Sequence, residues 1–188
     1  LDKDTSGVMV FAKSDPAHQH LSKQFQDRTV KRDYLALVFG KLKQSSGAFS
    51  EPIGRHPVNR KKMSVQSVRG KPALTRWKVM QSFDQLSLVE AALATGRTHQ
   101  IRVHFSSAGH PVVGDALYGG ERRAGGIVNV NLRRAIQKLP ALLLHARSLT
   151  FEHPISKKIL VFDVPIPDYF QEILNILGFL LIIEGFLQ

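Results

Sequence analysis

The chain opens with Leu1-Asp2-Lys3-Asp4-Thr5-Ser6-Gly7, which runs directly into the apolar segment Val8-Met9-Val10-Phe11-Ala12. Thr, Ser and Gly build turns, whereas a short apolar run that follows a turn predicts a buried strand. We therefore expect two carboxylates, Asp2 and Asp4, in a polar turn at the mouth of the first strand. Each acid is either a solvated turn residue or a group that takes part in chemistry, and the local sequence does not choose between them.

Outward from this stretch, helical and strand patterns are interleaved irregularly. Hairpin-like pairs of strands favour an antiparallel or mixed sheet with flanking helices, so the predicted class is α+β. The glycine-rich segment 119–126 is predicted to be a flexible basic loop. The expected strands are 30–39, a segment around Trp77 and Val79, 86–93, 144–151 and 159–164, and the expected helices begin at Ser14, near Thr98 (apolar face Ile101, Phe105 and Ala108) and at Asp168.

Charge is the most unusual feature of the composition. The 188 residues include 26 Lys and Arg against 15 Asp and Glu, a net charge of +11, while 43% of residues are hydrophobic. One domain with a core is expected, with a polyanion as its partner: nucleic acid first, an anionic membrane surface second. A basic surface that binds nothing is the alternative. The chain has no cysteine, which excludes disulfides and thiolate sites and is compatible with a cytoplasmic location.

Part of this charge is concentrated in one stretch that carries no acid. Gly and Pro are interspersed there, which predicts an exposed hairpin or loop. The cations of the basic stretch are Arg55, Arg60, Lys61, Lys62, Arg69 and Lys71, and Arg122 and Arg123 add two more in the glycine-rich segment.

The apolar segment 173–187 is interrupted by Gly and Glu and is too short to span a membrane, so no membrane association is expected.

Two further positions are candidates for chemistry. Arg97 lies in a tight turn before a predicted helix, where it is either a surface residue or the partner of a buried acid. Tyr34, on the strand 30–39, is either a core tyrosine or a flat platform for a base. His99 and His104 are five residues apart without a Glu-x-x-His pattern, so no metal is expected. The glycine-rich segment lacks the Gly-Lys-Ser/Thr ending of a P-loop, which argues against a nucleotide cofactor.

Several segments together resemble the motifs of the RluA-type pseudouridine synthases. Leu1 to Gly7 is similar to the end of that family's His-Arg-Leu-Asp-x-x-Thr-Ser-Gly motif. The resemblance runs in the expected order from Leu1 to about Gly178. The other matching segments are 31–40 (a tyrosine motif), 95–102 and 110–119 (an arginine motif and the segment after it), Leu144-His145-Ala146, His153-Pro154 and Pro165-Ile166-Pro167.

This resemblance implies an enzyme that isomerises uridines in RNA to pseudouridine without a cofactor. Asp2 would be the catalytic aspartate and Asp4 its companion, Tyr34 would stack on the flipped base and help with the proton that leaves C5, and Arg97 would pair with Asp2. Ile101, His99 and His145 would line the pocket, and the cations of 55–71 with Arg122 and Arg123 would contact RNA phosphates.

The stretch Gly54-Arg55-His56-Pro57 favours large-subunit ribosomal RNA over transfer RNA as the substrate. A catalytically inactive RNA-binding remnant of the same fold is the alternative. A glycoside hydrolase that uses Asp2 and Asp4 is a weaker hypothesis, because their spacing gives no reason for them to flank a sugar.

The family's His-Arg pair before Leu1 is not in this sequence. We therefore expect residues 1–178 to form the catalytic domain without the N-terminal part of its core, and 179–188 to be an apolar extension of unknown role. A cytoplasmic monomer is expected.

Overall fold

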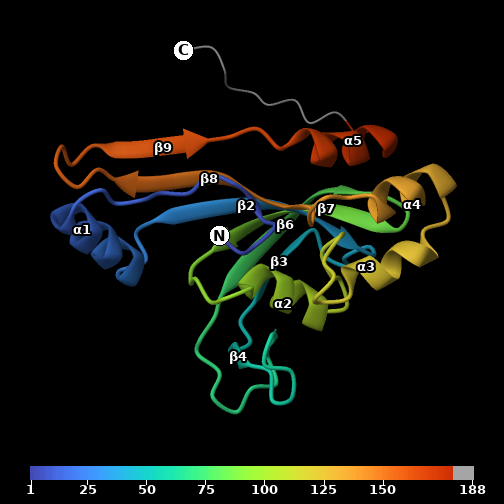
Figure 1. The fold of residues 1–188 in the computed structure, drawn as a ribbon, viewed down its shortest axis with the longest axis horizontal. Helices are drawn as coiled ribbons and strands as arrows, with labels where there is room; N and C mark the ends of the chain where they lie inside the picture. The colour runs from blue at the N-terminus through green and yellow to red at the C-terminus, as the bar shows by residue number, and fades with distance from the viewer. Residues whose placement is uncertain (180–188) are drawn as a thin grey trace.

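A seven-stranded mixed sheet organises the protein, whose computed structural model describes residues 1–179 (Figure 1). The strand order is β1-β8-β2-β7-β6-β3, and β9 pairs with β8 beside β1. Among the described strands of this sheet, only the β1–β8 pairing is parallel. This arrangement confirms the α+β class. The strands are β1 (Ser6–Gly7), β2 (Lys31–Phe39), β3 (Ser46–Phe49), β6 (Thr75–Ser82), β7 (Leu86–Leu93), β8 (Leu144–Glu152) and β9 (Ile159–Asp163).

Helices cover both faces of this sheet, and a small hairpin of β4 (Gly54–Arg55) and β5 (Met63–Ser64) projects from it on the side of α2 (Figure 1). The hairpin corresponds to the basic stretch of the sequence. Among residues 1–179, no helix is both long and apolar enough to cross a bilayer. The helices are α1 (Asp15–Gln26), α2 (Gln100–Ser107), α3 (Gly120–Arg123), α4 (Val130–Gln137) and α5 (Asp168–Ile176), with a 3₁₀ turn at Ala124–Gly126.

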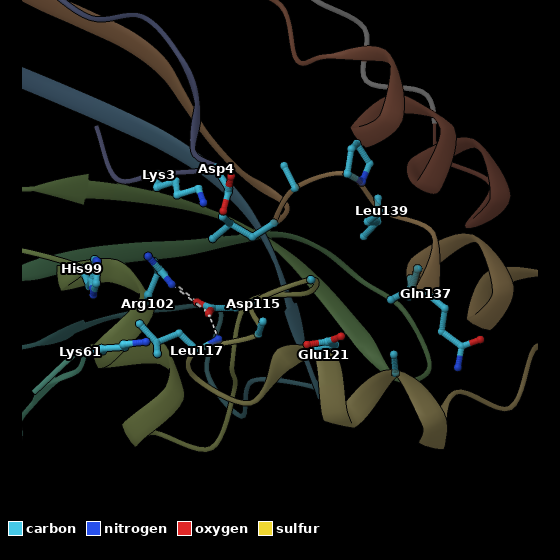
Figure 2. Close-up of a pocket in the computed structure, with 17 residues that line it drawn as sticks. Lys3, Asp4, Lys61, His99, Arg102, Asp115, Leu117, Glu121, Gln137 and Leu139 are labelled. Atoms are coloured by element: carbon cyan, nitrogen blue, oxygen red, sulfur yellow. Dashed lines mark hydrogen bonds and ion pairs between the residues drawn. The ribbon is translucent and has the colours of Figure 1, made fainter. Parts of the chain in front are cut away.

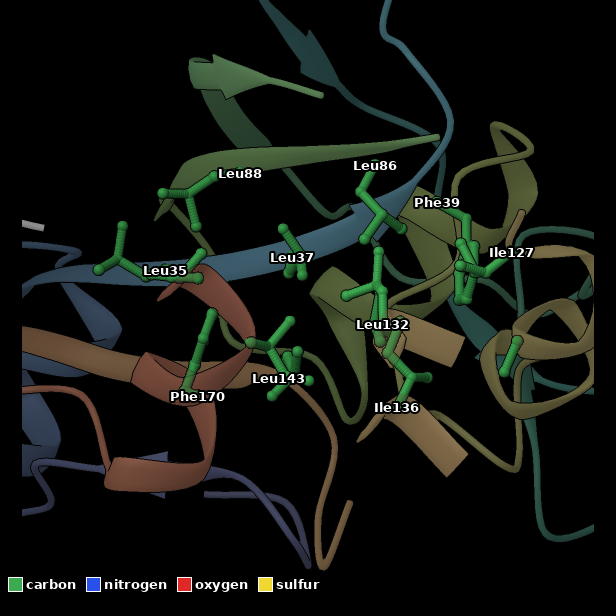
Figure 3. Packing of buried hydrophobic residues seen from close by; sticks show 14 of the residues in the cluster. Leu35, Leu37, Phe39, Leu86, Leu88, Ile127, Leu132, Ile136, Leu143 and Phe170 are labelled. Atoms are coloured by element: carbon green, nitrogen blue, oxygen red, sulfur yellow. The ribbon is translucent and has the colours of Figure 1, made fainter. Parts of the chain in front are cut away.

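The alternation along β2 explains how the two faces are filled. Leu35 and Leu37 point to one face, where they pack with α4 and α5 through residues such as Leu132 and Phe170 (Figure 3). Ala36 and Val38 point to the other face and pack with Ile101 and Phe105 of α2. Since successive strand residues face opposite sides of the sheet, this one apolar run contributes to both cores. Each fully buried large side chain stabilises the fold by about 2 kcal/mol.

The predicted first strand is mostly absent. Only Ser6–Gly7 is a strand, and the amide of Val8 makes the last hydrogen bond to β8, at 2.9 Å from the Ala146 carbonyl. Beyond that point β9 occupies the same edge of β8, so the run 8–12 has no strand to pair with. Its alternate residues pack on one side only, and Met9 and Phe11 are 50% and 76% exposed.

Other expectations also need correction. Residues 120–126 are helical rather than a flexible loop, and Gly120 packs so tightly against the Val112 carbonyl that a Cβ there would collide with its oxygen. Ala108 lies just beyond α2 and is exposed instead of belonging to its apolar face. β3 and α4 were not predicted. Of the apolar extension 179–188, residues 180–188 lie outside the described residues.

Candidate active site

Asp2 begins a tight turn. The amide of Thr5 donates to the Asp2 carbonyl at 3.1 Å, and Asp4, the third residue of the turn, has a φ of 67°. Asp is among the few residues other than glycine that adopt this left-handed conformation readily. The turn therefore fixes the backbone of Asp2 and gives the two carboxylates different roles, with Asp4 shaping the turn.

β8 holds this turn in place. The side chain of His145 donates from Nε2 to the Val164 carbonyl (3.2 Å), so its Nδ1 accepts from the Ser6 hydroxyl (2.9 Å). Gly7 has a φ of 115°, and a Cβ there would lie 2.2 Å from the Ala146 oxygen. Burial lowers the pKa of His145, which keeps the ring neutral and able to accept. His145 thus supports β1 and does not line the cavity beside Asp2, so that pocket prediction was wrong.

The ionic partner of Asp2 is Arg102, in the first turn of α2. Its Nη1 lies 3.4 Å from Asp2 Oδ2, with the two side chains 8% and 23% exposed. The same guanidinium makes two shorter bonds to Asp115, from Nε to Oδ2 (2.7 Å) and from Nη2 to Oδ1 (3.0 Å) (Figure 2). A planar fork with five donors can bridge two carboxylates in this way, which an ammonium cannot.

Asp115 is the fixed end of this arrangement. It is fully buried, and its Oδ1 also accepts from the amides of Leu117 and Tyr118, both at 3.0 Å. Burial alone would lower the pKa of Arg102, but hydrogen bonds and charge from Asp115 and Asp2 raise it overall. Arg102 is therefore a permanent cation that is held by one acid and aimed at the other.

Arg97, predicted to pair with Asp2, does not do so. Its Nε donates to the Pro72 carbonyl at 3.0 Å, and its amide donates to Gln100 Oε1 at 3.0 Å. Gln100 also accepts from the Thr95 hydroxyl (2.7 Å), so the turn 95–97 is tied to the helix start and Arg97 is held at the Pro72 carbonyl. The predicted pairing was wrong, because the ionic partner of Asp2 is Arg102.

Asp2 and Tyr34 line the same cavity, of about 390 Å³, together with Ile101 and Arg97. Register explains this meeting, because Tyr34 and Gly7 are both opposite Ala146 on the two sides of β8. Burial raises the pKa of the Tyr34 hydroxyl, and the charge of Asp2 raises it further. Ile101 lines this cavity with Asp2 and Tyr34, and its place in a substrate pocket stays a prediction.

His99 lies outside this cavity and lines a neighbouring one of about 820 Å³, which also contains Lys3, Asp4 and Lys61 (Figure 2). It precedes α2 with a φ of 57°. Its Nδ1 lies 2.8 Å from the Tyr118 hydroxyl. Since the amide of Met63 donates to that hydroxyl (2.9 Å), the hydroxyl proton points to His99. Burial lowers the pKa of His99, consistent with its role as an acceptor.

Comparison with known proteins decides the family. The sequence model described as RNA pseudouridylate synthase matches residues 1–107. The chain belongs to the RNA pseudouridylate synthase family. Similar proteins include the ribosomal large subunit pseudouridine synthases D of Nitrosomonas europaea (46% identity over 168 residues; 89% of this chain, 47% of the relative) and Neisseria meningitidis serogroup A (45% over 178; 94% and 46%). This chain thus spans about half the length of these curated relatives.

The fold is also similar to solved pseudouridylate synthase domains. Human RNA pseudouridylate synthase domain containing 1 matches with a TM-score of 0.70 and 33% identity, covering 89% of this chain and 67% of that one. Human RNA pseudouridylate synthase domain containing 4 matches with a TM-score of 0.73 and 26% identity, covering 95% and 74%. The predicted pseudouridine synthase fold is confirmed.

In this synthase domain the basic hairpin is attached to the site through Tyr118. Besides the bond from Met63, the Tyr118 ring lies 5.0 Å from the Arg102 guanidinium carbon and 5.9 Å from Lys62 Nζ. Arg122 and Lys62 line one shallow cavity beside Tyr118. The cations predicted to contact RNA are surface groups, and none forms an ion pair with another described residue: Arg55, Arg60, Lys61, Lys62, Arg69, Lys71, Arg122 and Arg123.

The sequence reasoning missed four residues that build this site: Gln100, Arg102, Asp115 and Tyr118. Gln100 satisfies all of its amide bonding, because its Nε2 also donates to the Leu74 carbonyl and the Thr75 hydroxyl, both at 3.0 Å. Arg102 and Asp115 are thirteen residues apart, and nothing in the sequence pairs them. Their contact can be inferred only when α2 is known to pack against the loop that follows it. In this structure α2, the helix that follows the turn, carries the ionic partner of Asp2.

Proposed function

We propose that this protein isomerises uridines in RNA to pseudouridine, with large-subunit ribosomal RNA as its substrate and Asp2 as the essential catalytic group. One observation carries the proposal: a carboxylate paired with a buried, permanent cation shares a small cavity with a tyrosine ring. A carboxylate that a guanidinium holds beside an apolar wall is suited to act on the ribose or base of one nucleotide.

The cavity can receive a single base. Tyr34 offers a flat ring, and Ile101 and Leu144 supply apolar contacts beside Asp2. In the proposed reaction the bond from ribose C1′ to N1 breaks, the base rotates and a bond forms from C1′ to C5. The proton on C5 leaves to solvent and N1 takes up a proton, so the product is an isomer of the substrate. A base must leave its stack to enter, which costs least in loops and bulges.

The positive charge supports RNA as the substrate. The exposed cations of the hairpin and the helical segment 120–126 have no acid partner in the described part of the chain, so phosphates can neutralise them. The choice of large-subunit ribosomal RNA is supported by the names of the similar bacterial proteins. The predicted cytoplasmic location and monomeric state belong to this proposal, and cell fractionation and sedimentation would measure them.

The test is release of tritium from large-subunit ribosomal RNA labelled at C5 of its uridines. We expect the 188-residue protein to release tritium with a product that co-migrates with pseudouridine after digestion. Binding of the same RNA in a salt-sensitive manner without any release would reject the catalytic proposal and favour an RNA-binding remnant of the fold.

A further inference from the structure

Two arginines without an acid partner lie at the cavity that contains Asp2 and Tyr34. Arg32 is on β2, two residues before Tyr34 and on the same face, and Arg97 is in the turn before α2. Gly96 lies between them on the cavity wall. Neither arginine forms an ion pair within residues 1–179.

Arg32 is held in place by neutral groups. Its Nη2 donates to the Leu93 carbonyl at 3.3 Å, and its guanidinium carbon lies 5.4 Å from the Phe25 ring centre. Its Nε is buried and has no hydrogen-bond partner in the described structure. A Cβ on Gly96 would lie 2.7 Å from Arg32 Nη1, so the absence of a side chain at residue 96 makes room for the guanidinium.

Arg97 is similarly available. Within residues 1–179 only its Nε is engaged, by the Pro72 carbonyl, which leaves both terminal nitrogens able to donate. Burial lowers the pKa of Arg32, and the charge of Tyr34 only partly opposes this effect. An anion in the cavity would compensate for the burial of the charge.

The described residues 1–179 do not provide this anion. Among them, Asp2 is the one carboxylate that lines the cavity, and Arg102 already pairs with it. The remaining source is the ligand. We propose that Arg32 and Arg97 form a phosphate subsite that holds the RNA backbone beside the flipped nucleotide. The proposal rests on the proposed function for the identity of the ligand, and arginine suits it because its fork can donate two bonds to one phosphate.

The experiment measures RNA affinity and chemistry separately in Arg32→Gln and Arg97→Gln. Each variant should weaken binding of the ribosomal RNA about tenfold and reduce the slope of log K against log salt by about one. The single-turnover rate constant at saturating RNA should change less than threefold. Arg134→Gln on α4 is the matched control, because that exposed arginine has no hydrogen bond or ion pair in the described chain.

Two further variants distinguish the loss of the phosphate subsite from a loss of folding. Gly96→Ala should reproduce the weaker binding of Arg32→Gln, since the new methyl group displaces the guanidinium. Arg32→Lys should restore the salt slope while regaining only part of the affinity. Unchanged affinity and slope in Arg97→Gln and Gly96→Ala, with folding intact by thermal unfolding, would overturn the subsite. An inactive wild-type protein whose RNA affinity still depends on both arginines would refute the proposed function and leave the subsite standing.

Discussion

Replacing Arg102 with lysine tests the corrected ion pair, because it keeps the charge and removes the fork. The ammonium cannot contact both oxygens of Asp115 and also Asp2. It should remain with Asp115, whose contacts of 2.7 and 3.0 Å are shorter and fully buried. Asp2, whose contact is 3.4 Å, should lose its cation.

The size of the effect follows from that distance. At 3.4 Å and an effective dielectric constant of about 20, the Arg102–Asp2 attraction is about 5 kcal/mol. Asp2 is partly solvated, so we expect a net loss of about 2 to 3 kcal/mol, which is roughly 30- to 150-fold in the rate constant. The lost hydrogen bonds of a charged group should lower the free energy of unfolding by about 2 kcal/mol.

The assay is single-turnover tritium release at saturating RNA, alongside urea unfolding to show that the variant is folded. Arg134→Lys is the control, since it makes the same chemical change on an exposed helix face. A folded Arg102→Lys protein that works within threefold of the wild type would refute the assignment of Arg102 as the partner that keeps Asp2 competent.

Three other perturbations have expected outcomes. Gly7→Ala should lower the free energy of unfolding by at least 2 kcal/mol and abolish tritium release, because its Cβ would collide with the Ala146 carbonyl at a φ of 115°; a stable, active variant would contradict the β1 anchoring. Burial lowers the pKa of His99, His104 and His145 below the ordinary value of 6.5, so the unfolded state binds more protons than the folded state as the pH falls through 6.5. The free energy of unfolding should therefore decline on acidification below pH 6.5, and a flat profile in urea titrations would count against it. Replacing Arg60, Lys61 and Arg69 together with glutamine should reduce the salt slope of RNA binding by two to three with less than 0.5 kcal/mol change in stability, whereas an unchanged slope would remove the hairpin from the RNA interface.

The sheet could be predicted from sequence because its strands carry their own signal. The alternation over 30–39 places Leu35 and Ala36 on opposite faces, and the structure shows each packed against a different set of helices. The run 8–12 carries a similar signal but is not a strand. Whether it pairs depends on β9, about 150 residues later in the chain, which occupies the edge of β8.

The candidate site was predictable only in part, for a related reason. The Asp2–Tyr34 meeting follows from motifs that the sequence displays, and the cavity contains both residues. The choice between Arg97 and Arg102 depends on a left-handed residue at His99 and on Asp115 reaching back to α2. Neither feature has a local sequence pattern. From the sequence alone, Arg97 in the turn and Arg102 in the helix are therefore equally good candidates for the ionic partner of Asp2.

We propose that Asp2, and not its neighbour Asp4, drives uridine isomerisation. The most direct measurement compares tritium release from C5-labelled large-subunit ribosomal RNA by Asp2→Asn and Asp4→Asn. Asparagine tolerates the left-handed conformation of residue 4, so the Asp4 variant keeps the turn and matches the other in charge. We predict no detectable release with Asp2→Asn and release within tenfold of the wild type with Asp4→Asn. Release by a folded Asp2→Asn protein at the wild-type rate would refute the role of Asp2 as the catalytic group.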